Sequence, residues 1–186
     1  MIRNFVPHFF FIIPFFLFHN AFANEHNWEP ALEGNKVILI RHALAPGSGD
    51  PKEFDINKCN TQRNLNNIGI EQSKKIGKLF NMNNIKIDKV LSSQWCRCKD
   101  TAKYAFKNFT EFSALNSTFS PPYDKKEKKQ IKELKNYVQK WDGNGGNLIL
   151  VTHYVVITAV TDAIPSSGEI IITDKNFKVL STIKTF

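Results

Sequence analysis

An arginine and a histidine, Arg41 and His42, directly follow a run of apolar residues at 37–40. Three of the four residues in this run are β-branched, which predicts a short strand buried on both faces. The guanidinium of arginine presents a planar fork of donors that suits a phosphate or a carboxylate, and a neutral imidazole is a nucleophile. The pair could therefore hold a phosphoryl group and attack it. Adjacent basic residues also follow strands in proteins where they have no chemical role. The rest of the chain therefore has to show whether this pair has one.

Two more basic groups come after apolar runs later in the chain. Arg97 falls in the first turn of a predicted helix capped by Ser92 or Ser93, where unpaired backbone N–H groups and the helix dipole favour an anion. His153 comes just after the buried strand predicted at 147–151. Strand ends at one edge of an open α/β sheet converge on one cleft, and clustered positive charge repels itself unless an anion relieves the repulsion. We therefore expect an anion site at this edge.

The remaining hydrophobic patterns predict a sheet and the helices that would cover it. Further strands are predicted at 89–92, 112–115, 147–151, 169–173 and 177–183, and helices at about 68–82, 93–106, 124–141 and 155–162. This alternation predicts an α/β protein. A chain of 186 residues is long enough for one domain with a full core.

A loop of residues 43–65, rich in Pro, Gly, Asp and Asn, separates the first basic pair from the first long helix. Loops of this length are usually functional or disordered. Because this loop contains Cys59 and Arg63, we expect it to be tied to the rest of the domain. Backbone N–H groups of Gly47 and Gly49 could face a phosphate, although a glycine-rich loop alone is a weak signal.

The first 23 residues have the pattern of a secretory signal peptide. A positive start at Arg3 precedes an apolar run of about ten residues, and the small-x-small site Ala21-Phe22-Ala23 follows. We expect cleavage after Ala23, with residues 24–186 as a single domain that is periplasmic or secreted. An uncleaved membrane anchor is the alternative, but a comfortable span needs roughly 20 apolar residues.

Export would bring the three cysteines into an oxidising compartment, where one disulfide is expected. Cys96 and Cys98 are too close in sequence to pair easily with each other on a helix. We therefore expect Cys59 to pair with one of these two, which leaves one free thiol. A catalytic cysteine is the alternative, and only the nearby Arg97 favours it.

The chain is basic, with a net charge of +8. Without residues 1–23, which hold one arginine and no acidic residue, 24 Lys and Arg stand against 17 Asp and Glu, or +7. This balance suits phosphoesters, acidic lipid headgroups or nucleic acid. An exported protein rarely meets nucleic acid, so we expect no nucleic-acid partner and no stable membrane insertion after cleavage. We interpret the lysine-rich helix 124–141 as a solvated surface.

Four motifs in this order resemble those of the histidine phosphatase superfamily, which has the phosphoglycerate mutase-like fold. They are Leu39-Ile40-Arg41-His42, the segment 63–72 that begins at Arg63, the segment 90–102 that contains Arg97, and Leu150-Val151-Thr152-His153. The resemblance covers about residues 36–162 and is greatest to small exported bacterial members without large lid insertions. It implies a three-layer sandwich, with a mostly parallel central sheet and helices on both faces.

The resemblance also implies a role for each matching residue. His42 corresponds to the nucleophile that becomes phosphohistidine, and Arg41, Arg97 and His153 correspond to the groups that hold the phosphoryl oxygens. Arg63 is predicted to help bind the substrate. Phosphoryl transfer needs in-line positioning and neutralisation of the equatorial oxygens. Two guanidiniums and a second imidazole would supply both, and the resemblance implies no metal and no cofactor.

Two positions depart from the family pattern. Ala43 replaces the usual glycine after the histidine, a small change that some members share. The general acid that protonates the leaving group in many members has no clear counterpart. Asp50, in the loop after His42, is the first candidate, and Asp124 and Glu169 are weaker ones. A substrate with a good leaving group would need no acid.

The sequence thus predicts a metal-independent phosphatase that hydrolyses a phosphomonoester through a phosphohistidine on His42. The predicted partner is a phosphorylated small molecule or an envelope glycan, such as a phosphorylated envelope sugar, and the oligomeric state is left open. A non-catalytic envelope protein that binds an anion in the same pocket is the alternative, although a binder needs no nucleophile. A metallohydrolase built on His42, His153 and an aspartate is a third possibility, which no close His-x-x-x-His spacing supports.

Overall fold

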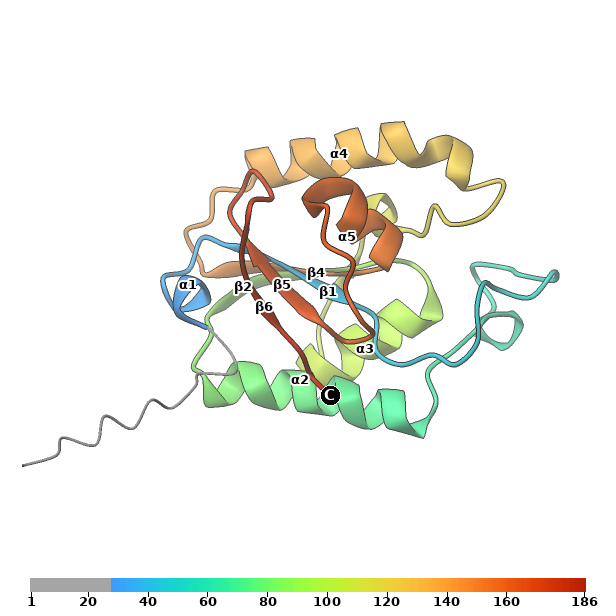
Figure 1. Cartoon of the computed structure of the whole chain (residues 1–186), viewed down its shortest axis with the longest axis horizontal. Coiled ribbons are helices and arrows are strands. Elements are labelled where there is room, and N and C mark those ends of the chain that lie inside the picture. Colours follow the sequence, from blue (N-terminus) through green and yellow to red (C-terminus); the bar gives the residue numbers. More distant parts are fainter. Residues whose placement is uncertain (1–27) are drawn as a thin grey trace, which may run out of the picture.

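A computed structural model describes residues 28–186 of the chain. Its centre is a six-stranded sheet in the order β3-β2-β4-β1-β5-β6 (Figure 1). The strands are β1 (Val37–Arg41), β2 (Ile87–Ser92), β3 (Thr110–Glu111), β4 (Asn147–Thr152), β5 (Ile170–Thr173) and β6 (Val179–Ile183). The pairs β1–β4, β4–β2 and β2–β3 are parallel, whereas β5 joins β1, and β6 joins β5, in antiparallel pairs. The predicted mostly parallel sheet is confirmed.

Helices cover both faces of this sheet, as the three-layer prediction requires. After the short α1 (Glu29–Leu32), α2 (Asn67–Met82) and α3 (Cys96–Phe106) lie on one face, and α4 (Glu127–Lys140) and α5 (Tyr154–Thr161) lie on the other (Figure 1). Successive side chains of a strand point to opposite faces. In β1, Ile38 and Ile40 therefore pack with α2 and α3, whereas Val37 and Leu39 pack with α4 and α5. Both faces of β1 are therefore buried, which fixes the position of the strand that leads to Arg41 and His42.

The first turns of α2 hold the segment that follows Arg41 and His42. Asn66 caps α2, its side chain accepting a hydrogen bond from Gly69 N at 2.9 Å. Gly69 packs so closely on the preceding loop that a Cβ there would lie 2.1 Å from Leu44 O. Gln72 Oε1 accepts a hydrogen bond from Leu44 N at 2.9 Å. The first residues after His42 are thereby fixed against a helix.

The predicted strand at 112–115 is wrong. The structure has the two-residue β3 slightly earlier, and the 3-10 turn η2 (Ser113–Leu115) follows it. Ala114 and Leu115 are fully buried under α4. A short apolar run bounded by loops does not distinguish a strand from a buried turn, and here the run is buried as a turn.

The helix predicted from Asp124 begins three residues later than expected. A short 3-10 turn, η3 (Asp124–Lys126), comes first, and α4 starts at Glu127. Asp124 does not cap the helix, because its Oδ1 accepts a hydrogen bond from Lys125 N. The lysines of α4 are exposed.

The predicted serine cap of α3 is also wrong. The helix begins at Cys96, with Trp95 at the N-cap and no hydrogen bond from a capping side chain. Ser93 Oγ accepts a hydrogen bond from Trp95 N at 3.3 Å and lies 3.0 Å from His153 Nε2. Ser93 thus contacts a histidine at the end of another strand. Arg97 still occupies the first turn of α3, as predicted.

Cys59 forms a disulfide with Cys96, one of the two predicted pairings. The bridge ties the 3-10 turn η1 (Cys59–Thr61), within the loop 43–65, to the first residue of α3. Cys98 is a buried free thiol, and burial raises its pKa to about 12. Because the thiolate is the reactive form of cysteine, this thiol gives the catalytic-cysteine alternative no support.

The predicted signal peptide, residues 1–23, lies outside the described residues, so its cleavage and the export of the chain stay predictions. Between residues 28 and 186, none of the helices combines the length and the apolarity that a membrane-spanning helix needs.

Candidate active site

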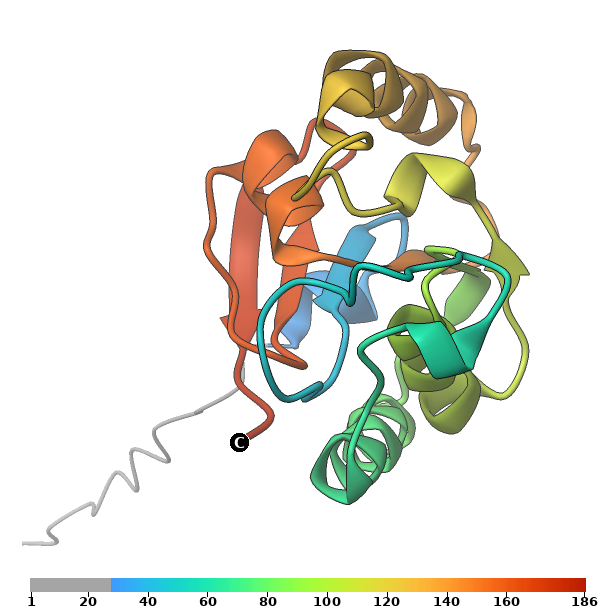
Figure 2. The ribbon, with the colours of Figure 1, turned by 90° about the vertical axis from the view of Figure 1, so that its right-hand side faces the viewer.

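The carboxyl ends of β1, β4 and β2 border a cavity of about 570 Å3. Figure 2 views the molecule from this side, and the loop 43–65 curves in front of the strand ends. Arg41 and His42 line the cavity at the end of β1, His153 lines it just after β4, and Arg97 lines it from α3. The structure thus brings together the four residues that the sequence singled out.

His42 has the orientation of a neutral nucleophile. Its side chain is 2% exposed, and its Nδ1 lies 2.8 Å from Ala43 O. A carbonyl oxygen can only accept, so Nδ1 carries the proton and Nε2 keeps a lone pair. Burial holds the pKa of His42 well below its usual range, and the charges of nearby arginines, Arg97 foremost, lower it further. The imidazole therefore stays neutral at pH 7.

Backbone contacts hold His42 in this place. His42 N donates to Thr152 O at 2.9 Å, which continues the ladder between β1 and β4. Ala43 N donates to Thr101 Oγ1 of α3, also at 2.9 Å. Ala43 is fully buried, and its φ is not positive. Alanine therefore fits where the family usually has glycine.

Two of the three arginines that line the cavity, Arg41 and Arg97, keep a buried donor without a partner. Arg41 Nη1 donates to Pro165 O at 2.8 Å, and the guanidinium lies 5.3 Å from the centroid of the Tyr154 ring. Among residues 28–186, Arg41 Nε and Arg97 Nε are both buried without a hydrogen-bond partner. Burying an unpaired donor costs free energy. Both N–H groups are therefore suited to an anion that enters the cavity.

His153 is held from behind by a short polar chain. Its Nε2 lies 3.0 Å from Ser93 Oγ, which in turn lies 3.1 Å from Asn116 Oδ1. His153 Nδ1 lies 3.4 Å from Arg97 Nη2, which can only donate. The neutral ring therefore carries its proton on Nε2. Burial, followed by the charge of Arg97, holds the pKa of His153 well below its usual range.

The sequence did not indicate this support. A serine just before a helix predicts a cap, and no local pattern singles out Asn116. A polar residue directly after a buried strand was the only available signal for Ser93. Asn116 comes from the segment after η2, and its place beside β2 depends on a path that local patterns do not reveal.

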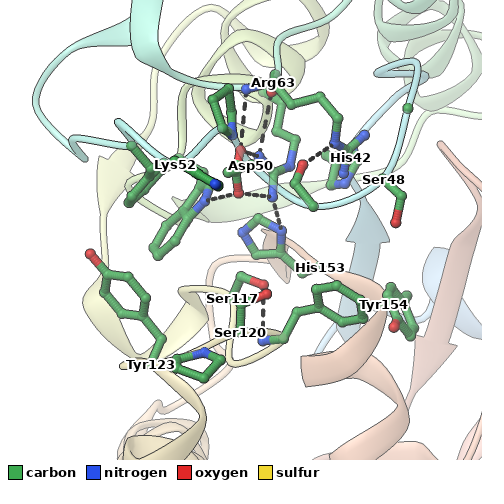
Figure 3. Close-up of a pocket in the computed structure, with 18 of the residues that line it drawn as sticks. His42, Ser48, Asp50, Lys52, Arg63, Ser117, Ser120, Tyr123, His153 and Tyr154 are labelled. Carbon is green, nitrogen blue, oxygen red and sulfur yellow. Dashed lines mark hydrogen bonds and ion pairs between the residues drawn. The ribbon is translucent and has the colours of Figure 1, made fainter.

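Asp50 lies in the cavity, but its contacts oppose the predicted role of general acid (Figure 3). Its Oδ1 accepts from Arg97 Nη1 at 2.7 Å, and its Oδ2 accepts from Arg97 Nη2 at 3.2 Å. Trp95 Nε1 and Arg63 N donate to the same carboxylate, at 3.0 and 3.2 Å. Burial alone would raise the pKa of Asp50, but the hydrogen bonds and the charge of Arg97 outweigh it, and the pKa is lowered. An ionised carboxylate has no proton to give, so we correct this assignment.

The other two acid candidates do not line the cavity. Asp124 is exposed on η3. Glu169 is mostly buried, and its Oε2 accepts a hydrogen bond from Ser166 N at 2.7 Å. Neither residue is placed to protonate a leaving group beside His42.

Arg63 does line the cavity, but most of its contacts hold the loop. Its Nε donates to Gly49 O at 2.8 Å, and its Nη1 donates to Ala45 O. Its backbone N–H donates to Asp50 Oδ1. Gly47 and Gly49 also line the cavity, both with positive φ. Arg63 and the disulfide tie the loop 43–65 to the rest of the domain, as expected. Substrate binding by Arg63 stays a prediction.

No protein-family model matches the sequence, and no curated protein matches it. Solved structures do match the fold. A putative phosphohistidine phosphatase SixA from Agrobacterium tumefaciens matches with a TM-score of 0.56 and 20% identity, over 81% of this chain and 99% of that chain. A phosphoserine phosphatase mutant from Entamoeba histolytica, in complex with phosphoserine, matches with a TM-score of 0.56 and 15% identity, over 81% and 97%. A putative alpha-ribazole-5'-P phosphatase from Escherichia coli matches with a TM-score of 0.57 and 15% identity, over 82% and 97%.

These structures belong to the histidine phosphatase superfamily, so the chain has the fold of that superfamily. This confirms the fold that the four sequence motifs predicted. At these identities the likeness concerns the fold, and what the site does has to be argued from its own residues.

Proposed function

We propose that this protein is a metal-independent phosphatase that hydrolyses a phosphomonoester through a phosphohistidine on His42. The orientation of His42 is the observation that carries the proposal. Its Nδ1–H is bound to Ala43 O, so the Nε2 lone pair is available in a cavity that also contains two arginine Nε–H donors without partners. The likeness of the fold to proteins described as phosphohistidine and phosphoserine phosphatases adds support. The phosphorylated envelope sugar stays a prediction that depends on export.

The reaction would proceed in two displacements. The Nε2 lone pair forms a bond to phosphorus as the ester P–O bond breaks, and the leaving group departs with the bonding electrons and gains a proton from water. A water molecule then attacks phosphorus, loses a proton to solvent, and breaks the N–P bond, which returns neutral His42 and releases phosphate. Arg41 and Arg97 would neutralise the equatorial oxygens in both steps.

In this mechanism Asp50 is a positioning residue that acts through Arg97. A guanidinium has two edges that can hold an oxyanion: one between Nη1 and Nη2, and one between Nε and Nη2. Asp50 occupies the first edge of Arg97 with both carboxylate oxygens. On the second edge Nη2 also faces His153 Nδ1, and the partnerless Nε–H remains for the phosphoryl group. Asp50 would thus aim the fork of Arg97 at the reacting phosphorus.

Replacing Asp50 with asparagine tests this role against that of an acid. Losing one charge-assisted hydrogen bond to Arg97 should lower kcat/KM by roughly ten- to a hundredfold. The loss should be the same for an alkyl phosphate and for p-nitrophenyl phosphate, because the fault lies in holding the phosphoryl group. Asp55→Asn in the same loop, outside the cavity, is the matched control. A far larger loss on the alkyl ester would restore Asp50 as the general acid.

The low pKa values of the two histidines predict how pH affects stability. Both are lowered from the usual 6.5. The unfolded chain therefore binds more protons than the folded one as the pH falls through 6.5. The free energy of unfolding should accordingly be constant above about pH 7 and fall as the pH drops below 6.5. Thermal unfolding of the wild type and of His42→Ala between pH 5 and 8 measures this dependence. The prediction is contradicted if His42→Ala loses as much stability below pH 6.5 as the wild type does.

A direct test of the proposal is to trap the phosphoenzyme. Denaturing the protein in alkali after brief mixing with a 32P-labelled phosphomonoester should leave label on the chain, and acid should release it. Label that maps to the peptide containing His42 supports the mechanism. Tight binding of phosphate, with no label and no turnover of any phosphomonoester, would favour the anion-binding alternative instead.

A further inference from the structure

The outer part of the cavity is walled by aromatic rings. On one side, Phe54 stacks on Trp95 with the ring centroids 5.0 Å apart and an angle of 23° between the rings, and Tyr123 packs edge-on against Trp95, also at 5.0 Å. On the other side, Phe119 packs against Tyr154 with their centroids 6.0 Å apart. Figure 3 shows Tyr123 and Tyr154 on opposite sides of the cavity, with His153 between them. The rings come from four separate segments of the chain.

These rings differ in how firmly they are held. Trp95 is 2% exposed, with its Nε1 bound to Asp50, so it forms a fixed base for Phe54 and Tyr123. Phe119 is 50% exposed and also lines the cavity. Aromatic side chains prefer stacked or edge-to-face contact with other rings. A flat ring entering the cavity would find such surfaces on both sides.

The same cavity offers no carboxylic acid to a leaving group. Of the residues that line it, only Asp50 carries a carboxyl group, and that group is ionised and held by Arg97. A leaving oxygen without acid help must depart as an anion, and the barrier falls as the pKa of its conjugate acid falls. Phenols have a pKa of about 10, as in tyrosine, against roughly 16 for water and similar alcohols.

We infer that the substrate is a phosphate monoester of a phenol, whose ring lies between the aromatic walls and whose phenolate leaves without an acid. This inference rests on the proposed function and names its substrate class. The aromatic walls and the lack of a free carboxylic acid are separate observations, and both favour a phenol over a sugar alcohol. The phosphoryl group binds at Arg41, His42 and Arg97, and the ring extends outward toward Phe119 and Tyr123.

Three substrates separate the effect of an aromatic ring from the effect of a good leaving group. 2-Naphthyl phosphate has a ring and a phenolic leaving group, acetyl phosphate has a good leaving group and no ring, and glucose 6-phosphate has neither. We expect the wild-type enzyme to hydrolyse 2-naphthyl phosphate with at least a hundredfold greater kcat/KM than glucose 6-phosphate, which corresponds to the usual size of acid catalysis. Free O-phosphotyrosine and a phosphotyrosine peptide share the phenolic group, so comparing them tells a small aryl ester from a phosphorylated chain.

Wall variants test where the ring binds. Phe119→Ala should raise KM for 2-naphthyl phosphate about tenfold, the value of one aromatic contact, with kcat and the KM for acetyl phosphate unchanged. Phe186→Ala, at a phenylalanine that is 69% exposed and outside the cavity, is the matched control. Tyr123→Ala should have the same effect as Phe119→Ala.

Two results would overturn the inference while leaving the proposed function standing. One is a kcat/KM for glucose 6-phosphate equal to that for 2-naphthyl phosphate. The other is a KM for 2-naphthyl phosphate that neither wall variant changes. Failure to turn over acetyl phosphate, together with no label on His42, would instead refute the proposed phosphatase itself.

Discussion

The His42→Ala variant should lose at least about a thousandfold in kcat/KM, because it lacks the nucleophile that splits hydrolysis into two displacements. Only the side chain beyond Cβ disappears, so the backbone bond from residue 42 to Thr152 O is retained. Alkali-stable label on the chain should vanish along with turnover. The two readouts together distinguish a missing nucleophile from a misplaced substrate.

The thermal stability of His42→Ala and its binding of phosphate serve as controls. The melting temperature at pH 7.5 should change by only a few degrees, since the site faces a cavity and the strand beneath it is intact. Phosphate should still protect the variant against thermal unfolding, because Arg41 and Arg97 remain. Near-normal turnover in a folded variant would end the phosphohistidine mechanism.

The Arg97→Lys variant should lose about a hundredfold in kcat/KM, although it keeps the positive charge. The arginine holds both oxygens of Asp50 with its Nη atoms and leaves its Nε for the phosphoryl group. A single ammonium group lacks the two edges needed for both contacts. Steady-state kinetics on p-nitrophenyl phosphate would measure the loss.

A double-mutant cycle makes this second prediction sharper. If Asp50 acts through Arg97, Asp50→Asn should cost much less activity in the Arg97→Lys background than in the wild type. Additive losses would mean that the two residues act separately. An Arg97→Lys enzyme with most of its activity would show that the ion pair is structural and that the phosphoryl group is held elsewhere.

The central sheet and most of the candidate site residues could be predicted because both follow from local pattern. Continuous apolar runs mark the buried parallel strands, and the ends of such strands meet at one edge. His42 and His153 directly follow β1 and β4, which contain two of these runs. Their convergence therefore needs no knowledge of the path taken by the loops.

The contacts that depend on loop paths could not be predicted. Only its position in the loop after His42 indicates that Asp50 lies near the site, and no local pattern indicates that Arg97 binds it. Ser93 looked like a cap because a serine before a helix usually is one, yet the bond to His153 is tertiary. The aromatic walls have the same origin, since Phe54, Trp95 and Tyr123 meet only when three segments fold together.

The disulfide between Cys59 and Cys96 makes the place of synthesis matter for this protein. It closes a loop of 37 residues, a constraint on the unfolded chain of about 4 kcal/mol. Within that loop lies Arg63, whose backbone N–H helps to hold Asp50. The same polypeptide made in a reducing cytoplasm would lack the bridge, and Arg97 would lose part of the scaffold that aims it. Two preparations with identical sequence and mass, apart from two hydrogens, would then be different catalysts.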